Sequence, residues 1–151
     1  MKLPDEALVK LSNIKKNYNV IISADIFESF NIYTSVGSIK VLGYMYFYEA
    51  SGDIFCIGLC EPQEVNTLAG KFKVKWISFF PDGRLDKIIL SEPEEVNTRS
   101  GKLKVQEISF DDDGPVGVTL SEPQEVNTDR GKLKLDGKIR FDINGSIIKN
   151  K

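Results

Sequence analysis

Apolar and polar residues alternate over short stretches along most of the chain, a pattern that predicts β-strands with one buried face. Residues 102–105 read Lys, Leu, Lys, Val, and residues 116–120 read Val, Gly, Val, Thr, Leu. Such stretches are separated by Gly, Pro, Asp and Asn, which favour turns. The chain is therefore expected to consist mainly of antiparallel strands joined by tight turns.

The alternation slips by one residue at two equivalent points. Ile77 comes three residues after Val74, and Ile108 comes three residues after Val105. A β-bulge sets two residues of one strand opposite one residue of its partner, so it returns both apolar positions to the same face. The pattern predicts bulges at Lys75–Trp76 and Gln106–Glu107.

Near copies of one heptapeptide, Glu-Pro-Gln/Glu-Glu-Val-Asn-Thr, occur at residues 61–67, 92–98 and 122–128. Each copy precedes a Gly-Lys-x-Lys sequence, and residues 32–41 are a diverged copy of the same stretch. Self-similarity at a fixed period is typical of repeat architectures. The chain thus divides into an N-terminal segment, residues 1–27, and four units, residues 28–60, 61–91, 92–121 and 122–151.

Each unit also contains a turn that ends in glycine, as in Pro81-Asp82-Gly83. Proline presets the first residue of a type I turn, and glycine supplies the positive φ that follows it in a hairpin. The segments on both sides are therefore expected to pair as a hairpin. The structural turn glycines, spaced 31 residues apart, are Gly52, Gly83, Gly114 and Gly145.

We predict an all-β fold in which tandem β-hairpins form an elongated antiparallel meander sheet. A β-solenoid, with the Thr-x-x-Gly, Asp-Gly and Glu-Pro steps as corners, is the alternative. The N-terminal segment differs, because residues 4–16 begin with Pro and acids, end with Lys and place Leu8, Leu11 and Ile14 on one stripe. This predicts a short amphipathic helix that covers the first strand.

Recurring hairpins over residues 28–151, with Phe-x-x-Asp-Gly or Phe-x-x-Asn-Gly at the tip, resemble the arrays of MORN-type β-hairpin repeat proteins and their bacterial relatives. The units here are longer and lack the Tyr-x-Gly start of that family. The resemblance implies an extended sheet used for protein binding or scaffolding, and it carries over no functional residue.

The absence of histidine restricts the chemistry available to the chain. Its 151 residues contain 20 Lys plus Arg, 22 Asp plus Glu and no His, with a formal net charge of -2. Catalytic Ser-His-Asp or Cys-His groups and zinc sites that need imidazole are excluded. The balanced charge provides no basic patch for nucleic acid or for an anionic membrane. We expect no enzyme activity, no metal and no cofactor; a hydrolase that uses carboxylates alone is the remaining enzymatic alternative.

Acidic residues and cysteines are expected to have structural roles. The Asp111-Asp112-Asp113 triplet lies where the other units have turns, so a turn explains it better than a calcium loop. On a strand, Cys56 and Cys60 would lie about 13 Å apart, too far for a disulfide, and we expect free thiols in small buried volumes. No apolar run suits a signal peptide or membrane span, and a cytoplasmic location is expected.

Aromatic residues concentrate in residues 43–49, in a stretch that no other unit repeats. An aromatic row can bury a partner's surface or stack on sugars. Alternatively, the tyrosines fill a sheet face against the N-terminal helix. We predict a non-enzymatic protein-interaction or scaffold module that binds a protein, or a second copy through a sheet edge; a carbohydrate-binding module is the alternative. The candidate binding residues are Tyr44, Tyr46, Tyr48 and, on a neighbouring strand, Trp76.

Overall fold

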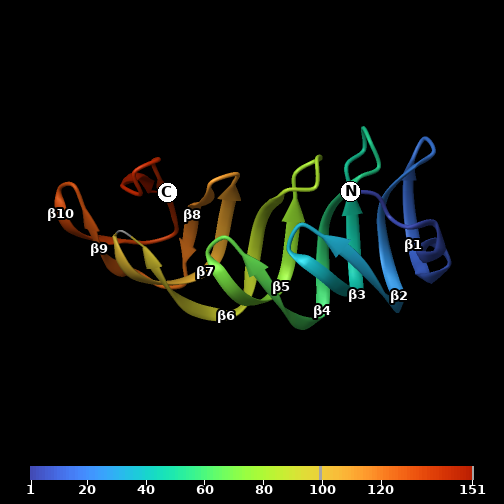
Figure 1. Ribbon diagram of the computed structural model, residues 1–151, viewed down its shortest axis with the longest axis horizontal. Helices are drawn as coiled ribbons and strands as arrows, with labels where there is room; N and C mark the ends of the chain where they lie inside the picture. Colours follow the sequence, from blue (N-terminus) through green and yellow to red (C-terminus); the bar gives the residue numbers. More distant parts are fainter. Residues whose placement is uncertain (99, 151) are drawn as a thin grey trace.

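Ten antiparallel strands form one open meander sheet in the computed structural model, which describes residues 1–98 and 100–150 (Figure 1). The strands follow one another in the order β1-β2-β3-β4-β5-β6-β7-β8-β11-β12, and β9 and β10 form a separate pair. Strands β1 to β8 therefore pair with the strands next to them in the sequence, and β11 pairs with β8. The predicted all-β hairpin meander is confirmed, and the solenoid alternative is wrong.

The elements are short at both ends and long in the middle of the chain. They are η1 (Asp5–Lys10), β1 (Leu11–Asn17), β2 (Val20–Thr34), β3 (Gly37–Phe47), β4 (Ile54–Thr67), β5 (Gly70–Phe79), β6 (Leu85–Thr98), β7 (Gly101–Asp111), β8 (Gly114–Leu120), β9 (Gln124–Thr128), β10 (Gly131–Leu135), β11 (Lys138–Phe141) and β12 (Ile147–Asn150).

The long strands bend midway along their length. The register of β4 with β5 breaks between Gly58 and Gln63, and that of β6 with β7 breaks between Ile89 and Glu94. Pro62 and Pro93 lie in these breaks, where a residue without an N–H costs no ladder bond. Beyond each break the two strands continue as a hairpin that folds back over one face of the sheet (Figure 1). These four folded-back hairpins are residues 30–41, 63–74, 94–98 with 101–105, and 124–135.

The hydrophobic core lies between the sheet and the folded-back hairpins. Both predicted bulges are confirmed, because the register skips Lys75 between Val74 and Trp76 and skips Gln106 in the same way. As a result, Val74 and Ile77 are both fully buried. Other core side chains include Met45, Ile57, Phe79, Ile88 and Ile108 from the sheet and Ile39, Val65, Phe72 and Leu103 from the hairpins.

Two kinds of turn recur in the fold, one at the tips of the folded-back hairpins and one between consecutive strands of the sheet. At each hairpin tip a threonine hydroxyl donates to the glycine carbonyl three residues later, over 2.8 Å in all four copies, from Thr34, Thr67, Thr98 and Thr128. The predicted turn glycines have positive φ values of 73° at Gly52, 90° at Gly83, 131° at Gly114 and 81° at Gly145. Only glycine adopts these values without strain.

The N-terminal segment differs from its prediction. Its helix is a 3-10 helix limited to Asp5–Lys10, and residues 11–17 form edge strand β1, which pairs with β2 from Leu11 opposite Ile26 to Asn17 opposite Val20. An isolated helix of about 13 residues is marginal in water, and Ser12 and Asn13 are poor helix formers. Pairing with β2 satisfies backbone groups that an exposed helix end would leave to solvent.

Side chains of glutamine join neighbouring folded-back hairpins. The Gln63 amide accepts from the Lys40 N–H over 3.0 Å and donates to the Lys40 carbonyl. Gln124 does the same at Lys104, with distances of 2.8 and 2.6 Å. Each glutamine side chain thus makes the two hydrogen bonds to the lysine backbone that a residue of a paired strand would make.

We expect Glu94→Gln to raise the free energy of unfolding by about 1 kcal/mol. Glu94 occupies the position of Gln63 and Gln124 in its unit, and Lys73 occupies the position of Lys40 and Lys104 in the preceding hairpin. A carboxylate can accept from the Lys73 N–H but cannot donate to its carbonyl, whereas an amide can do both. Urea denaturation measures the change, and Gln63→Glu should lower stability by a similar amount. An unchanged or lower stability of Glu94→Gln would contradict this account.

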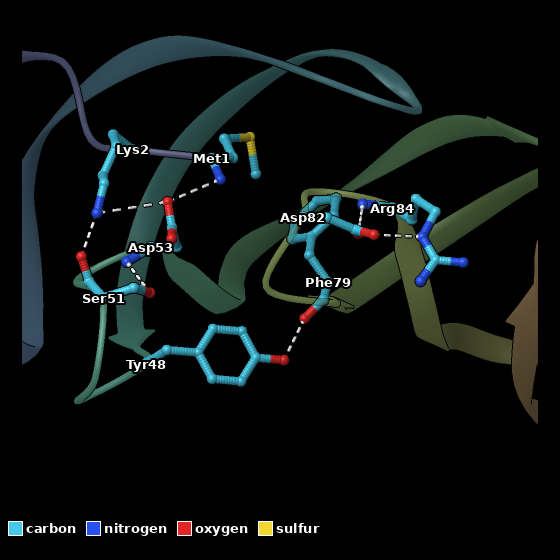
Figure 2. A network of polar contacts seen from close by, with 8 residues as sticks. All are labelled: Met1, Lys2, Tyr48, Ser51, Asp53, Phe79, Asp82 and Arg84. Atoms are coloured by element: carbon cyan, nitrogen blue, oxygen red, sulfur yellow. Dashed lines mark hydrogen bonds and ion pairs between the residues drawn. The ribbon is translucent and has the colours of Figure 1, made fainter.

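A polar network ties the start of the chain to the turn before β4 (Figure 2). The N-terminal ammonium group donates to Asp53 Oδ1 over 3.0 Å, and Lys2 Nζ lies 3.6 Å from the same oxygen. The Met1 carbonyl accepts from the Ile54 N–H over 2.7 Å, so Met1 is held at both ends. Hydrogen bonds from Ser51 and from the ammonium group lower the pKa of the Asp53 carboxyl below its ordinary value.

The lowered pKa of Asp53 predicts a loss of stability in acid. A carboxyl group whose folded pKa lies below its unfolded value of about 3.9 stabilises the fold above that value and loses this contribution as pH falls through the folded pKa. We expect Asp53→Asn to be less stable than the parent chain at pH 7 and to lose less stability between pH 5 and pH 3. Thermal unfolding across this range is the measurement, with exposed Asp129→Asn as the control for one lost charge. Parallel pH profiles of the parent and Asp53→Asn would refute it.

Candidate functional site

The outer face, defined as the side of the ten-stranded sheet turned away from the folded-back hairpins, carries most of the predicted site residues. On β3, Tyr44 and Tyr46 are 40% and 48% exposed, while Met45 and Phe47 between and after them are buried. This is the alternation that a strand with one covered face produces. The two tyrosines therefore point away from the core.

Four aromatic rings gather on this face. Tyr44 and Tyr46 of β3, Phe55 of β4 and Trp76 of β5 line one shallow depression with Cys56 between them. Asp25 of β2 completes its margin, and its carboxylate accepts from Asn13 Nδ2 over 2.7 Å. We call these six residues the aromatic hollow.

The strand register explains why the rings meet. Tyr46 pairs with Cys56 and Cys56 with Ser78, so small residues follow the tyrosine across the sheet. In the next row Tyr44 pairs with Gly58 and Gly58 with Trp76. Large rings thus stand on both sides of small residues, which leaves a hollow between them.

Gly58 determines where the Tyr44 ring lies. A Cβ atom at Gly58 would lie 2.1 Å from two ring carbons of Tyr44, so the ring covers the glycine directly. The Tyr44 and Tyr46 rings meet edge to face, with centroids 5.7 Å apart and planes at 82°. Burial raises the pKa of the Tyr44 hydroxyl, with smaller contributions from Cys56 and Tyr46. The hydroxyl therefore stays protonated and can donate a hydrogen bond at neutral pH.

The two cysteines differ in exposure. Cys56 is buried at the base of the hollow as predicted, but Cys60 is exposed, so the expectation of a buried volume is wrong for Cys60. Cys60 lies within the register break of β4, next to Glu61 and Pro62 in the sequence. Burial raises the pKa of the Cys56 thiol to about 11, against hydrogen bonds with the Tyr46 backbone and Trp76 that lower it. At neutral pH the thiol is protonated and unactivated.

Tyr48 lies apart from the other predicted residues. Its hydroxyl donates to the Phe79 carbonyl over 2.6 Å (Figure 2), and its ring lies 4.9 Å from that of Phe55. Burial is the largest contribution that raises the pKa of its hydroxyl. Tyr48 therefore links the turn after β3 to β5 and supports one side of the hollow from outside it. The 3-10 helix contacts β2.

Asp25, Phe55 and Cys56 are hollow residues that were not predicted. Ile54 and Ile57 are both fully buried and three residues apart, which leaves Phe55 and Cys56 together on the outer face. The same three-residue spacing of apolar residues predicts the bulges that follow Val74 and Val105. The spacing of Ile54 and Ile57 is therefore the sequence signal that identifies Phe55 and Cys56.

Charged residues lie on the outer face beyond the hollow. Lys87 of β6 and Glu107 of β7 form an ion pair of 3.2 Å, and buried Ser78 donates to Asp86 over 3.1 Å. The outer face is therefore aromatic on strands β3, β4 and β5, and it carries charged residues on strands β6 and β7. An aromatic centre with a polar surround is the composition of a typical binding surface.

The acidic triplet makes contacts within its own turn and with the neighbouring turn of the sheet. The Asp111 carboxylate accepts from the Asp113 N–H over 2.9 Å, and Asp112 pairs with Arg84, which also binds Asp82. Over residues 1–98 and 100–150, no group of three acidic or sulfur side chains is arranged to hold a metal ion. Within the same residues, no helix is long and apolar enough to span a membrane. No family model, curated protein or solved structure matches the chain.

Proposed function

We propose that the chain is a non-enzymatic protein-interaction module that binds a partner protein through the aromatic hollow. The observation that carries the proposal is the exposure of Tyr44, Tyr46 and Phe55 around one depression of a strand face. Exposed aromatic side chains that surround a hollow are enriched at the energetic centres of protein interfaces. Tandem hairpins that resemble MORN-type repeats would supply the rigid sheet that presents the aromatic hollow.

The orientation of the rings favours a protein over a glycan. Tyr44 and Tyr46 stand at 82° to one another, so they do not form one flat platform for a sugar ring. A hollow with rings on its sides instead accommodates a protruding apolar side chain. The Lys87–Glu107 ion pair offers polar contacts at the rim, where a partner's charged residues would be placed.

Affinity capture with matched variants tests this function. The chain is immobilised beside the double variant Tyr44→Ala/Tyr46→Ala and the control Tyr18→Ala/Tyr33→Ala, whose tyrosines are 94% and 86% exposed away from the hollow. We expect proteins that bind the parent and the control to be lost from the hollow variant, by tenfold or more in affinity. Far-UV circular dichroism establishes that all three are folded.

Two outcomes would count against the proposal. If the folded hollow variant captures the same proteins as the control with equal affinity, the hollow is not the binding surface. If the parent binds a glycan on an array and the hollow variant does not, while no captured protein depends on Tyr44 and Tyr46, the carbohydrate alternative replaces it.

A further inference from the structure

A cleft on the opposite side of the molecule separates the tips of the folded-back hairpins from the turns of the sheet. It has a volume of about 800 Å³ and is lined by the hairpin tip at residues 68–72 and by the sheet turns at residues 113–116 and 141–145. A second hollow of about 440 Å³ borders it, since Leu68 and Asp111 line both. The aromatic hollow shares no residue with either of them.

The cleft has an apolar base. Its base is formed by side chains that also belong to the hydrophobic core. They are Phe72 and Val96 from the hairpins and Ile108 and Val118 from the sheet. Leu68 and Ile143 stand at its rims and are 70% and 93% exposed. A ligand that enters the cleft can therefore bury apolar side chains against both rims.

Carboxylates dominate the charged residues of the same cleft. Lys71 is its one lining cation among the described residues, against five acidic residues. Asp111 and Asp142 accept backbone N–H bonds of their own turns, which leaves their charge unneutralised. The acidic lining residues are Glu94, Glu95, Asp111, Asp113 and Asp142.

We propose that this cleft binds an extended cationic peptide segment of a partner protein, with Lys or Arg side chains alternating with apolar ones. The excess of carboxylates attracts the cations, and alternation directs every second side chain to the apolar base. A polyamine would satisfy the charge but not cover the base, and an apolar peptide would leave the carboxylates unpaired. Binding here leaves the outer face free, so the site goes beyond the function proposed for the aromatic hollow.

Fluorescence anisotropy with defined peptides tests the proposal. The probe is a fluorescein-labelled octapeptide that alternates Lys and Leu, and the comparison peptides alternate Glu with Leu and Lys with Ser. We expect the Lys/Leu peptide to bind most tightly, at least tenfold above both others, and to weaken as salt screens the carboxylates. Equal binding of either comparison peptide would overturn the proposal.

Variants then locate the site. Asp113→Asn keeps a residue that favours turns, and Ile143→Ser changes an almost fully exposed side chain, so both variants should fold. We expect each variant to lower the affinity for the Lys/Leu peptide about fivefold or more, a difference in binding free energy of roughly 1 kcal/mol. The matched controls are Asp129→Asn and Ile148→Ser, which lie outside the cleft lining. If the controls weaken binding as much as the cleft variants, or if the cleft variants bind normally, the peptide does not occupy the cleft.

Discussion

Phe79→Ala is expected to lower the free energy of unfolding by about 3 to 5 kcal/mol, the usual cost of emptying a fully buried aromatic site. Phe79 ends β5 near the middle of the sheet and has no exposed surface. Its backbone pairs with Leu85 and its carbonyl accepts the Tyr48 hydroxyl, so the strand holds the side chain in place and cannot easily collapse into the space. A loss of this size approaches the whole stability of many domains.

Urea denaturation measures this loss, with Trp76 fluorescence and far-UV circular dichroism as independent probes. Trp76 is the single tryptophan and lies on the same strand as Phe79, so it reports the centre of the sheet. Phe27→Ala is the control, because Phe27 is 60% exposed and its removal should cost less than about 1 kcal/mol. Equal losses in the two variants would contradict a core formed between the sheet and the hairpins.

The fold was predictable because its signals are local and recur. Pro81-Asp82-Gly83 specifies a turn by itself, and the three-residue spacing of Val74 and Ile77 specifies a bulge. Pairing between consecutive strands needs no long-range information once the turns are known. The folding of hairpins back over the sheet was not predicted. The fold-back depends on the direction in which the strands bend where their hydrogen-bond ladder is interrupted around Pro62. The proline indicates that the ladder is interrupted, but it does not indicate the direction of the bend.

The N-terminal segment shows where local reasoning fails. Leu8, Leu11 and Ile14 fit a helical stripe, yet Leu11 becomes buried as the first residue of β1, opposite Ile26. The pairing partner lies outside the local window, and tertiary contacts override a weak helix propensity. Periodicity over so few residues does not distinguish these outcomes.

Half of the candidate site followed from the departure of residues 43–49 from the repeat. That departure singled out Tyr44 and Tyr46, which lie with Trp76 around one depression. Trp76 lies on β5, two strands from β3, so the expectation of a neighbouring strand is wrong for this residue. Tyr48 could not be separated from them by alternation alone, because the register changes between Tyr46 and Phe47. The cleft was not predicted at all, since its two sides come from turns that are distant in the sequence.

Gly43→Ala should destabilise the chain by roughly 2 to 4 kcal/mol, through a backbone clash rather than a lost contact. Gly43 has a φ of 143°, and a Cβ atom there would lie 2.2 Å from the Gly58 carbonyl oxygen. Neither atom is the end of a flexible side chain, so β3 and β4 must move apart where Gly43 pairs with Leu59.

Gly37→Ala separates the clash from the cost of the backbone angle. Gly37 also has a positive φ, 106°, but a Cβ atom there would meet no heavy atom within 4 Å. Its substitution should cost only the conformational penalty of about 1 to 2 kcal/mol. Thermal unfolding compares the two variants, and equal losses would show that the close approach of β3 to β4 is relieved at no cost. Tyr44 follows Gly43, and its ring covers Gly58, so separation of β3 from β4 should also move Tyr44. We therefore expect Gly43→Ala to weaken the partner binding proposed at the aromatic hollow, and Gly37→Ala to leave it unchanged.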